Sequence, residues 1–375
     1  MDLLVLAEVR WGYFRTRKQF LLSRFPAPWR IFYAQPPAFG ADDPWQPRQE
    51  GRVTYFTVPF LKPGTTSPLY ERAIATPWGR ALAERVAEWY LARMLARLGV
   101  DPSPVVLDSN IYAAGLLSRL RKKLVFYDFN DSPFQFAGVP SWAWDYWRQT
   151  LGQVDTFFVV SEFYRRQLAQ QTSRPLVLLG NGVEFSHFAT PQAQPAELAE
   201  LPRPLIGYVG LLSHFLDFDV LEAIRQARRG GTVVLIGPGT PATDRPVREF
   251  AAREGVALLG PKPYAGLPGW MQALDVGVIP FRANDPHVQG INPNKVYQYL
   301  AAGVPVVTTP VLDLQPAAPL LQYADTPLAM ATAVGAALDA PRSPEAAHAL
   351  ARSHDWESLA ASMVSAIERR LEPAA

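Results

Sequence analysis

The sequence predicts an α/β protein with two domains, each built on a parallel β-sheet. Short apolar segments alternate along the chain with segments of helical periodicity, and this alternation is typical of parallel sheets with crossover helices. The 375 residues exceed what a single hydrophobic core usually organises. With 49% hydrophobic and 19% charged residues, the composition is that of a globular protein and not of a disordered chain.

The first domain is expected over residues 1–190. Its predicted strands are 3–7, 31–34, 53–58, 105–107, 123–127, 156–160 and 175–179, and its predicted helices are 16–25, 79–98, 113–121 and 162–170. The 79–98 segment has arginines and interleaved glutamates, and its apolar residues recur at helical spacing at positions 82, 86, 89, 90, 94, 95 and 98. We interpret it as an amphipathic helix that packs on the core, and a membrane-surface role is the less favoured alternative.

A Pro- and Ala-rich stretch without periodicity predicts a linker at 191–204. The second domain is expected over 205–355, with strands at 205–209, 232–236, 256–259, 276–280 and 304–308. A final helix is expected from residue 356 towards the C-terminus, over 356–375.

Composition excludes several classes of function. The net charge of +2 lacks the basic excess of general nucleic-acid binding, and the absence of cysteine excludes disulfides and thiolate metal sites. The five histidines show no metal-ligand spacing, and the first strand leads into no glycine fingerprint of a dehydrogenase. The N-terminus reads as a first strand and not as a signal peptide, so we expect a cytoplasmic protein, with peripheral attachment to the inner face of the plasma membrane as a further option.

The segment 290–310 carries the strongest local signal. A polar turn with Pro293 opens a helix, Gly303 suits the left-handed residue after it, and an apolar strand follows. Asn292 and Lys295 lie at the N-terminus of this helix, where free backbone amides favour the binding of an anion. The same loop follows the carboxyl end of a strand, where ligands of open α/β sheets bind. An ordinary βα loop without a ligand is the alternative.

The sequence of this segment resembles the donor-site helix of GT-B glycosyltransferases of the GT4 (group 1) type, particularly a bacterial polysaccharide-biosynthesis branch. The matching residues are N-P-N-K-V-Y-Q-Y-L-A-A-G-V-P-V-V. The resemblance implies two Rossmann-like domains whose parallel sheets face a central cleft, with the last helix packing back on the first domain. In the wider family two glutamates flank this helix start, and here those positions are Gly290 and Gln298. The second of these glutamates contacts the donor ribose in the family.

The resemblance and the strand ends together select the candidate site residues. The candidate catalytic residues are Lys295, Arg282 and Asp131. The candidate donor-binding residues are Gly210, Ser213, His214, Gly237, Lys262, Tyr264, Gly290, Ile291, Asn292 and Gln298. The candidate acceptor-binding residues are Trp11 and Arg15 in the basic, aromatic loop after the first strand, and Trp144 and Trp147 in the aromatic segment 134–147.

The implied function is that of a retaining hexosyltransferase-like enzyme that moves a sugar from a nucleotide-diphosphate sugar to a polysaccharide or lipid-linked acceptor. A membrane surface is a further candidate partner. A non-catalytic relative that scaffolds a polysaccharide-synthesis complex and a sugar-nucleotide epimerase are the alternatives. No cofactor and no metal are expected, because Asp217-Phe218-Asp219, which spells the D-x-D of metal-dependent transferases, sits where an N-cap and first helical turn are predicted.

Overall fold

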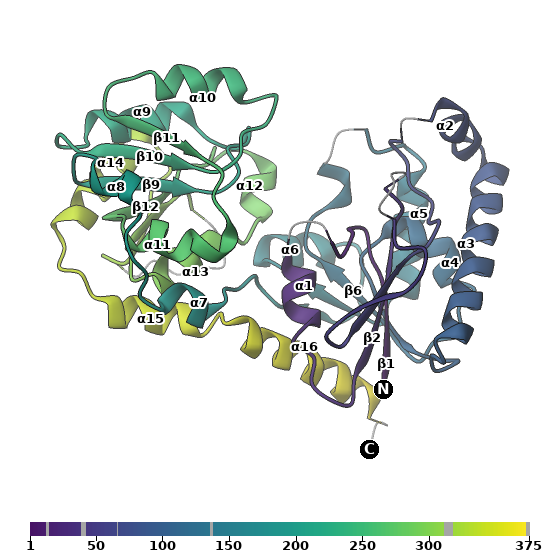
Figure 1. Ribbon diagram of the computed structural model, residues 1–375. Coiled ribbons are helices and arrows are strands. Elements are labelled where there is room, and N and C mark those ends of the chain that lie inside the picture. The colour runs from purple at the N-terminus through teal and green to yellow at the C-terminus, as the bar shows by residue number, and fades with distance from the viewer. Residues whose placement is uncertain (13–14, 39–42, 66, 136–137, 311–317, 373–375) are drawn as a thin grey trace. The chain divides into compact units, whose positions relative to one another are not determined.

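The computed structural model describes residues 1–12, 15–38, 43–65, 67–135, 138–310 and 318–372. The chain forms two compact units (Figure 1): the first is Met1–Gly180 together with Leu359–Ala375, and the second is Asn181–Ser358. Each unit is an α/β domain with its own sheet. The predicted α/β class is confirmed.

The sheet of the first unit has the strand order β3-β4-β2-β1-β5-β6-β7-β8. All neighbouring strands pair in parallel except β3 with β4. The bounds are β1 Asp2–Leu6, β2 Arg30–Gln35, β3 Arg48–Glu50, β4 Val53–Thr57, β5 Val105–Asp108, β6 Val125–Phe129, β7 Thr156–Val159 and β8 Leu176–Leu178. The chain winds outward from β1 to β2 and then returns to β5 on its other side, so the topological switch point lies between β1 and β5.

The helices of the first unit include a layer of consecutive, contacting helices at its outer edge (Figure 1). This layer holds α2 Pro68–Ala75, α3 Pro77–Arg97, the short η1 Ile111–Ala113, α4 Ala114–Leu117 and α5 Ala143–Gln153. The others are α1 Arg17–Leu22, η2 Pro133–Gln135, α6 Glu162–Ala169 and the larger part of α16 Trp356–Leu371. The Trp29 indole donates a hydrogen bond to Glu368 of α16, so the last helix is tied to the first unit.

The sheet of the second unit is parallel throughout, in the order β11-β10-β9-β12-β13-β14. Its strands are β9 Leu205–Val209, β10 Thr232–Ile236, β11 Val256–Gly260, β12 Val276–Ile279, β13 Val306–Thr308 and β14 Leu321–Tyr323. The switch point lies between β9 and β12. Ligands of open α/β sheets collect at such points, beyond the carboxyl ends of the strands.

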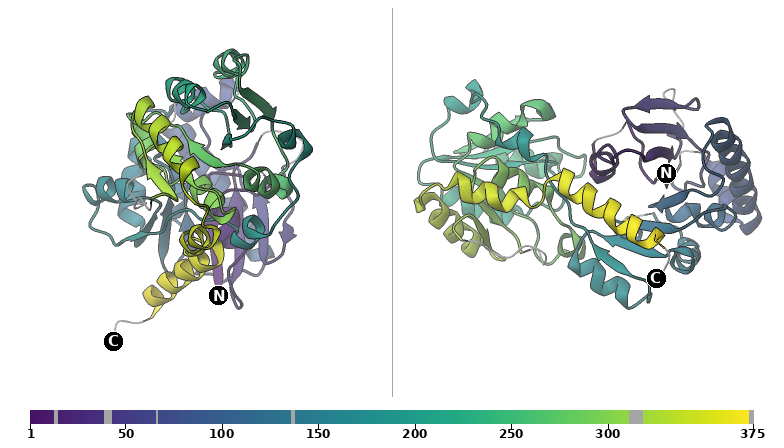
Figure 2. Two further views of the ribbon diagram at one scale, coloured as in Figure 1. Left: turned by 90° about the vertical axis from the view of Figure 1, so that its left-hand side faces the viewer. Right: turned by 90° about the horizontal axis from the view of Figure 1, so that it is seen from below.

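Helices flank both faces of this sheet (Figure 2). Contacts group α9 Phe218–Gln226, α10 Asp244–Ala251 and α14 Pro327–Asp339, and separately α7 Phe185–Ala189, α11 Leu267–Gln272, α13 Asn294–Ala301 and α15 Pro344–Arg352. The remaining short helices are α8 Ala196–Ala199, η3 Tyr264–Gly266 and α12 Pro286–Gly290.

The second unit begins at Asn181, earlier than the domain boundary predicted at residue 190. The reason is that Val183, Phe185 and Phe188 are buried in the core of the second unit. The predicted linker 191–204 contains the short helix α8, whose Leu198 is buried in the same core. Of the predicted final helix, residues 373–375 lie outside the described part of the chain.

Helix α3 is where the sequence interpretation differs most from the structure. Leu82, Val86 and Trp89 were expected in the core, but they are exposed, whereas Ala87 and Leu91 fill the core positions. Of the helices in the described residues, none combines the length and the apolar composition that crossing a bilayer requires.

Candidate functional site

The helix α13 and its flanking strands carry the predicted anion site of the second unit. Pro293 is the N-cap residue, and the helix ends before Gly303, whose φ of 73° is the left-handed conformation predicted for it. The amide of Val304 donates to the carbonyl of Tyr299 at 2.9 Å, which closes the helix and turns the chain into β13. The loop from β12 thus delivers Lys295 to the carboxyl edge of the sheet.

Lys295 lies directly against the backbone at the end of β9. A Cβ atom at Gly210 would overlap Cε of Lys295, and a Cβ at Gly237, after β10, would overlap the carbonyl of Gly210. Both glycines also have positive φ, 149° and 145°. The predicted donor residues Gly210 and Gly237 and the predicted catalytic residue Lys295 therefore form one tight cluster at the switch point between β9 and β12.

The ammonium group of Lys295 has no ion pair with any carboxylate of the described residues. Its Nζ lies 5.9 Å from the centre of the Tyr208 ring. Burial lowers the pKa of Lys295 to about 8, and no neighbouring charge offsets this effect. A partly buried cation without a protein anion is suited to an anionic ligand.

Tyr299 anchors α13 to the backbone of β9 next to this cluster. The sequence interpretation gave Tyr299 no role. Its hydroxyl accepts from the amide of Val209 at 2.7 Å and donates to the carbonyl of Gly207 at 3.1 Å. Tyr299 follows Lys295 by four positions on α13, so the two side chains share one helix face. The second tyrosine of the Y-x-Y pattern was the available signal for this role.

Ser213, His214 and Arg282 come from two neighbouring loops at the same edge. His214 is exposed beside Phe215, and the Phe215 ring stacks on His287 with 4.7 Å between centres. Arg282 is exposed, and its amide donates to the carbonyl of Phe215 at 2.9 Å. Ser213 is buried, and its hydroxyl accepts from the amide of Phe215. Burial lowers the pKa of His287, so the ring is neutral at pH 7.

The residues before α13 are held firmly. Asn292 is buried, its side-chain oxygen accepts from the Tyr297 hydroxyl at 3.1 Å, and its carbonyl accepts from the amide side chain of Asn181 at 2.8 Å. Gly290 and Gln298 are buried as well, whereas Ile291 is partly exposed. Asn292 therefore shapes the loop with its side chain, which leaves backbone groups of the turn as the possible ligand contacts.

Lys262 and Tyr264, the predicted residues after β11, are engaged elsewhere in the second unit. Lys262 pairs with Glu197 at 3.3 Å and lies 4.2 Å from the centre of the Trp270 ring. The Tyr264 hydroxyl donates to Glu184 at 2.8 Å, and its ring stacks on His187. These contacts attach the 262–264 turn to α7, α8 and α11 and do not bring either side chain to Lys295.

In the first unit, a cavity of about 390 Å³ lies at the switch point between β1 and β5. The loops after β1, β5 and β6 supply its walls. The lining residues are Glu8, Val9, Ser109, Asn110, Ile111, Tyr112, Tyr127, Asp128, Asn130, Asp131, Pro133 and Val139. A second cavity, of about 280 Å³, shares Glu8, Asn110, Tyr112 and Val139 with it and is also lined by Lys62. Asp131 was predicted here, whereas Glu8 and the 109–112 loop were missed.

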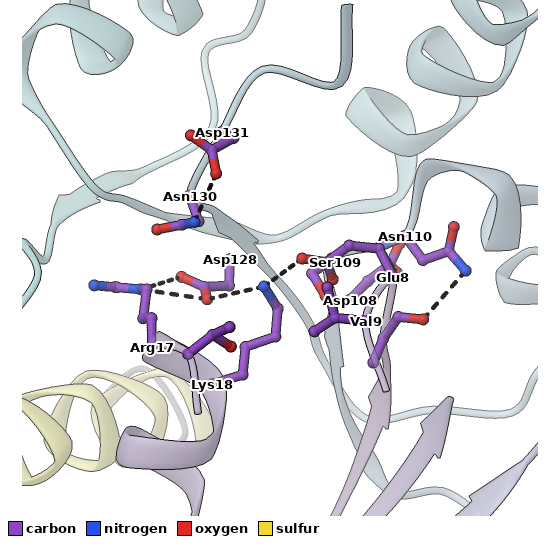
Figure 3. A network of polar contacts seen from close by, with 12 residues as sticks. Glu8, Val9, Arg17, Lys18, Asp108, Ser109, Asn110, Asp128, Asn130 and Asp131 are labelled. Atoms are coloured by element: carbon purple, nitrogen blue, oxygen red, sulfur yellow. Dashed lines mark hydrogen bonds and ion pairs between the residues drawn. The ribbon is translucent and has the colours of Figure 1, made fainter. Parts of the chain in front are cut away.

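A buried charge network (Figure 3) shares Glu8 and Asp128 with the lining of this cavity. Arg17 donates from Nε to Asp128 at 3.0 Å, and Lys18 Nζ lies 2.6 Å from Glu8 and 3.9 Å from Asp128. Burial lowers the pKa of Lys18, but the charges of Glu8 and Asp128 outweigh it, so the net shift is upward. Arg17 and Lys18 are therefore paired and buried, although charged residues at the start of a helix are usually solvated.

Two further carboxyl groups of this region have raised pKa values. Burial raises the pKa of Asp131 to about 6, and its side chain accepts from the Asn130 amide at 2.9 Å. Burial raises the pKa of Asp108 to about 8, while its Oδ1 accepts from the amide of Asn110. At pH 7 Asp131 is thus mostly ionised and Asp108 mostly protonated. The D-S-N triplet after the 105–107 strand was the signal that could have placed this loop in the site.

The four predicted acceptor residues separate into two groups. Trp11 and Trp147 are buried, and their indole nitrogens donate to Glu50 and Gln171 respectively. Their rings pack on other aromatic side chains of the first unit, so they are core residues and not the acceptor contacts that were predicted. Arg15 is exposed and lies 3.7 Å from Glu50. Trp144 is 49% exposed and stacks on Phe134 at 3.6 Å, which leaves one indole face for a ligand.

Asp217 has the N-cap role predicted for it. Its carboxylate accepts from the amides of Asp219 and Val220 at 3.0 and 3.3 Å, at the start of α9. Within the described residues, no group of three or more His, Asp or Glu side chains is arranged to hold a metal ion. The chemistry of Asp217 in this structure is therefore helix capping.

A known protein family matches most of the second unit and part of the last helix. Residues 203–368 match the family model described as glycosyl transferases group 1. A Bacillus subtilis (strain 168) protein named as a teichuronic acid biosynthesis glycosyltransferase, TuaH, is 28% identical over 131 residues, which are 34% of this chain and 33% of that protein. The match thus spans about a third of this curated relative.

Solved structures resemble the whole chain in fold. They include sucrose-phosphate synthase from Thermosynechococcus elongatus, with a TM-score of 0.73, 16% identity and 98% of both chains covered. Anabaena HepE in complex with UDP-glucose has a TM-score of 0.66 at 14% identity, covering 98% of this chain and 100% of that one. The Burkholderia xenovorans trehalose-phosphate synthase in complex with glucose-6-phosphate has a TM-score of 0.65 at 14% identity, covering 99% and 100%.

The class of protein follows from these matches. The chain has the GT-B fold, with two Rossmann-like α/β domains. The match over residues 203–368 identifies that part of the chain as a domain of the glycosyl transferases group 1 family.

Proposed function

We propose that the chain transfers a sugar from a nucleotide-diphosphate sugar, held by the second unit, to a hydroxyl acceptor, held by the first unit. The observation that carries the proposal is the Lys295–Gly210–Gly237 cluster. It offers a cation that pairs with no carboxylate of the described residues, together with two glycines whose bare backbone permits close approach. The cluster lies at the switch point of the unit that matches the family. Anabaena HepE, which shares the fold, was solved in complex with UDP-glucose.

Catalysis is assigned to electrostatic stabilisation of the leaving diphosphate. As the bond to the sugar breaks, negative charge grows on the diphosphate oxygens, and a fixed ammonium group stabilises that state more than the ground state. Arg282 is exposed in the neighbouring loop and is the second candidate cation. With Asp217 used as a helix cap, these cations support a metal-independent and, by family resemblance, retaining transfer.

The acceptor is assigned to the cavity at the switch point of the first unit. Its walls present the carboxylates of Glu8, Asp128 and Asp131, which accept hydrogen bonds from hydroxyl groups. The nearby cations Arg17 and Lys18 are already paired. An uncharged sugar end fits this environment better than a sugar phosphate, and the exposed face of Trp144 offers a stacking surface.

Asp131 is assigned the contact with the reacting hydroxyl. Its pKa of about 6 leaves it ionised at pH 7 yet basic enough to accept a proton in the transition state. We further assign the acceptor to a growing polysaccharide or a lipid-linked glycan, a choice favoured by the name of the Bacillus subtilis relative. The cytoplasm is the location that we propose for the protein.

A ligand screen tests the proposal. Thermal-shift and calorimetric titrations with nucleoside diphosphates and their sugar conjugates should identify one base that raises the melting temperature, because a ligand that binds the native state stabilises it by mass action. Lys295→Ala should lose most of this shift, while Arg245→Ala, which removes an exposed arginine of α10, should keep it. A wild-type protein that binds none of these ligands would contradict the donor assignment and favour a non-catalytic role.

A further inference from the structure

The contacting helices α2 and α3 both expose apolar and arginine side chains, and we call this set of residues the Trp–Arg face. Its apolar members are Leu69 (78% exposed), Trp78 (70%), Leu82 (63%), Val86 (47%) and Trp89 (64%), and its cations are Arg72, Arg85, Arg93 and Arg97. The positions 78, 82, 86, 89 and 93 recur at three- or four-residue intervals, so they form one stripe along α3. In Figure 1 this helix forms the outer edge of the first unit.

These apolar side chains are surplus to the core. The inner side of α3 is filled by Ala87, Leu91 and Met94, which are buried among the core residues of the first unit. Single exposed apolar residues are common, but two tryptophans, two leucines and a valine on one pair of helices form a patch of the kind that marks an interaction surface.

The acidic residues of both helices are turned to protein partners. Glu84 is buried against the Tyr146 hydroxyl and Arg119, and Arg119 also binds Glu88 at 2.8 Å. Glu71 accepts hydrogen bonds from the amide and hydroxyl of Thr65. The arginines of the Trp–Arg face are therefore exposed. Among the described residues, their single carboxylate contact is the 3.3 Å pair of Arg85 with Glu88. The glutamates, which argued from the sequence against a membrane role, do not neutralise the face.

We propose that the Trp–Arg face binds the surface of an anionic lipid bilayer. Tryptophan combines an apolar ring with one polar N–H group and is enriched at membrane–water boundaries, and arginines reach lipid phosphates with apolar stems along the same surface. Charge complementarity selects the lipid over a second copy of the chain. A two-fold contact would set the four arginines of one copy against the four of the other.

The Trp–Arg face and the candidate acceptor cavities are connected through α2. Its inner side chains Tyr70 and Ile74 pack with Leu61 and Tyr112, and the Tyr70 hydroxyl accepts from the amide of Lys62 at 3.1 Å. Leu61, Lys62 and Tyr112 line the smaller cavity. A bilayer at the face would lie one helix away from that cavity, which suits a lipid-linked acceptor. Membrane binding itself does not depend on the proposed transfer activity.

Vesicle co-sedimentation of the full chain tests the proposal. The protein should sediment with vesicles that contain phosphatidylglycerol and much less with phosphatidylcholine alone. Trp78→Ser with Leu82→Ser and Trp89→Ser should lower the partition coefficient at least tenfold, and Arg85→Gln with Arg93→Gln should lower it on the order of tenfold at low salt. Leu328→Ser, at a 77% exposed site of α14, and Arg245→Gln with Arg248→Gln on α10 are the matched controls.

All these side chains are exposed, so each variant should melt like the wild type, and a melting scan verifies this. The proposal is overturned if the wild type ignores anionic vesicles or if the control variants lose binding equally. It is also overturned if light scattering shows a dimer that the triple serine variant abolishes while vesicle binding is unchanged, because the face would then be a contact between copies of the chain.

Discussion

Lys295 occupies the space above Gly210 that any other residue at position 210 would need for its Cβ atom. This contact joins the helix α13 to the end of β9 and places the cation over bare backbone. The relationship makes the two positions interdependent, so substitutions at them should not be additive.

Gly210→Ala should therefore destabilise the second unit. The added methyl group overlaps Lys295, and overpacking of this kind costs about 1–3 kcal/mol, with further strain from the positive φ. Adding Lys295→Ala should recover about 1–2 kcal/mol of that loss, because it removes the overlapping atoms. Urea unfolding of the four variants of this cycle checks the coupling. Additive losses would show that the two residues do not share this space in solution.

The affinity for the nucleotide sugar should depend on pH through Lys295. Burial lowers the pKa of Lys295 to about 8 in the free protein, and a diphosphate binds the protonated form. Affinity should thus stay level from pH 7 to about 8 and fall as the pH rises further. Lys295→Arg keeps its charge throughout this range and should show no such fall. Calorimetric titrations from pH 7 to 9 measure both; the same fall in Lys295→Arg would assign the titration to another group.

Asp131 should control how the rate of transfer falls at low pH. Burial raises its pKa to about 6, so the carboxylate that accepts the acceptor's proton is lost as the pH falls through this value. Asp131→Asn should lower acceptor-dependent transfer by a factor of about 10²–10⁴ and remove the acid limb of the rate profile. Binding of the donor alone should not change. A donor affinity that falls together with the transfer rate would mean that Asp131 acts on the fold and not on the acceptor.

Asp217 should contribute to stability and not to metal binding. Its carboxylate caps α9 through two backbone amides, and Asp217→Ala should cost about 1 kcal/mol of stability. Asp219→Ala, in the first turn of the same helix, serves as the milder comparison. Transfer should be unchanged by excess EDTA. Loss of transfer in EDTA, with recovery on addition of manganese and renewed loss in Asp219→Ala, would identify a metal site.

The fold was largely predictable because the chain repeats one local pattern. The strands at 205–209 and 232–236 have the bounds predicted for them, and the final helix begins at the predicted residue 356, since buried strands and amphipathic helices have distinct periods. The short elements β3, β14 and α8 were not predicted, because three or four residues carry too little periodicity. The end of the helix at Gly303 was predictable because glycine readily adopts the left-handed conformation found there.

The candidate site was less predictable because it depends on contacts between distant segments. Lys295 could be selected from its place after a strand, but its contact with Gly210 arises from packing across the sheet. The pairing of Arg17 and Lys18 with Asp128 joins positions more than a hundred residues apart and gives no local signal. Trp147 and Trp144 are close in sequence, yet only the helix orientation decides that the first is buried and the second exposed.

The turnover of Lys295→Ala tests the central claim most directly. Release of nucleoside diphosphate from the sugar donor identified by the screen should fall by about two to three decades, the usual loss when one charge-assisted contact to the transition state is removed. Arg245→Ala should retain wild-type turnover, since that arginine is exposed on α10. A rate for folded Lys295→Ala within a few-fold of the wild type would contradict the assignment of the diphosphate site to Lys295.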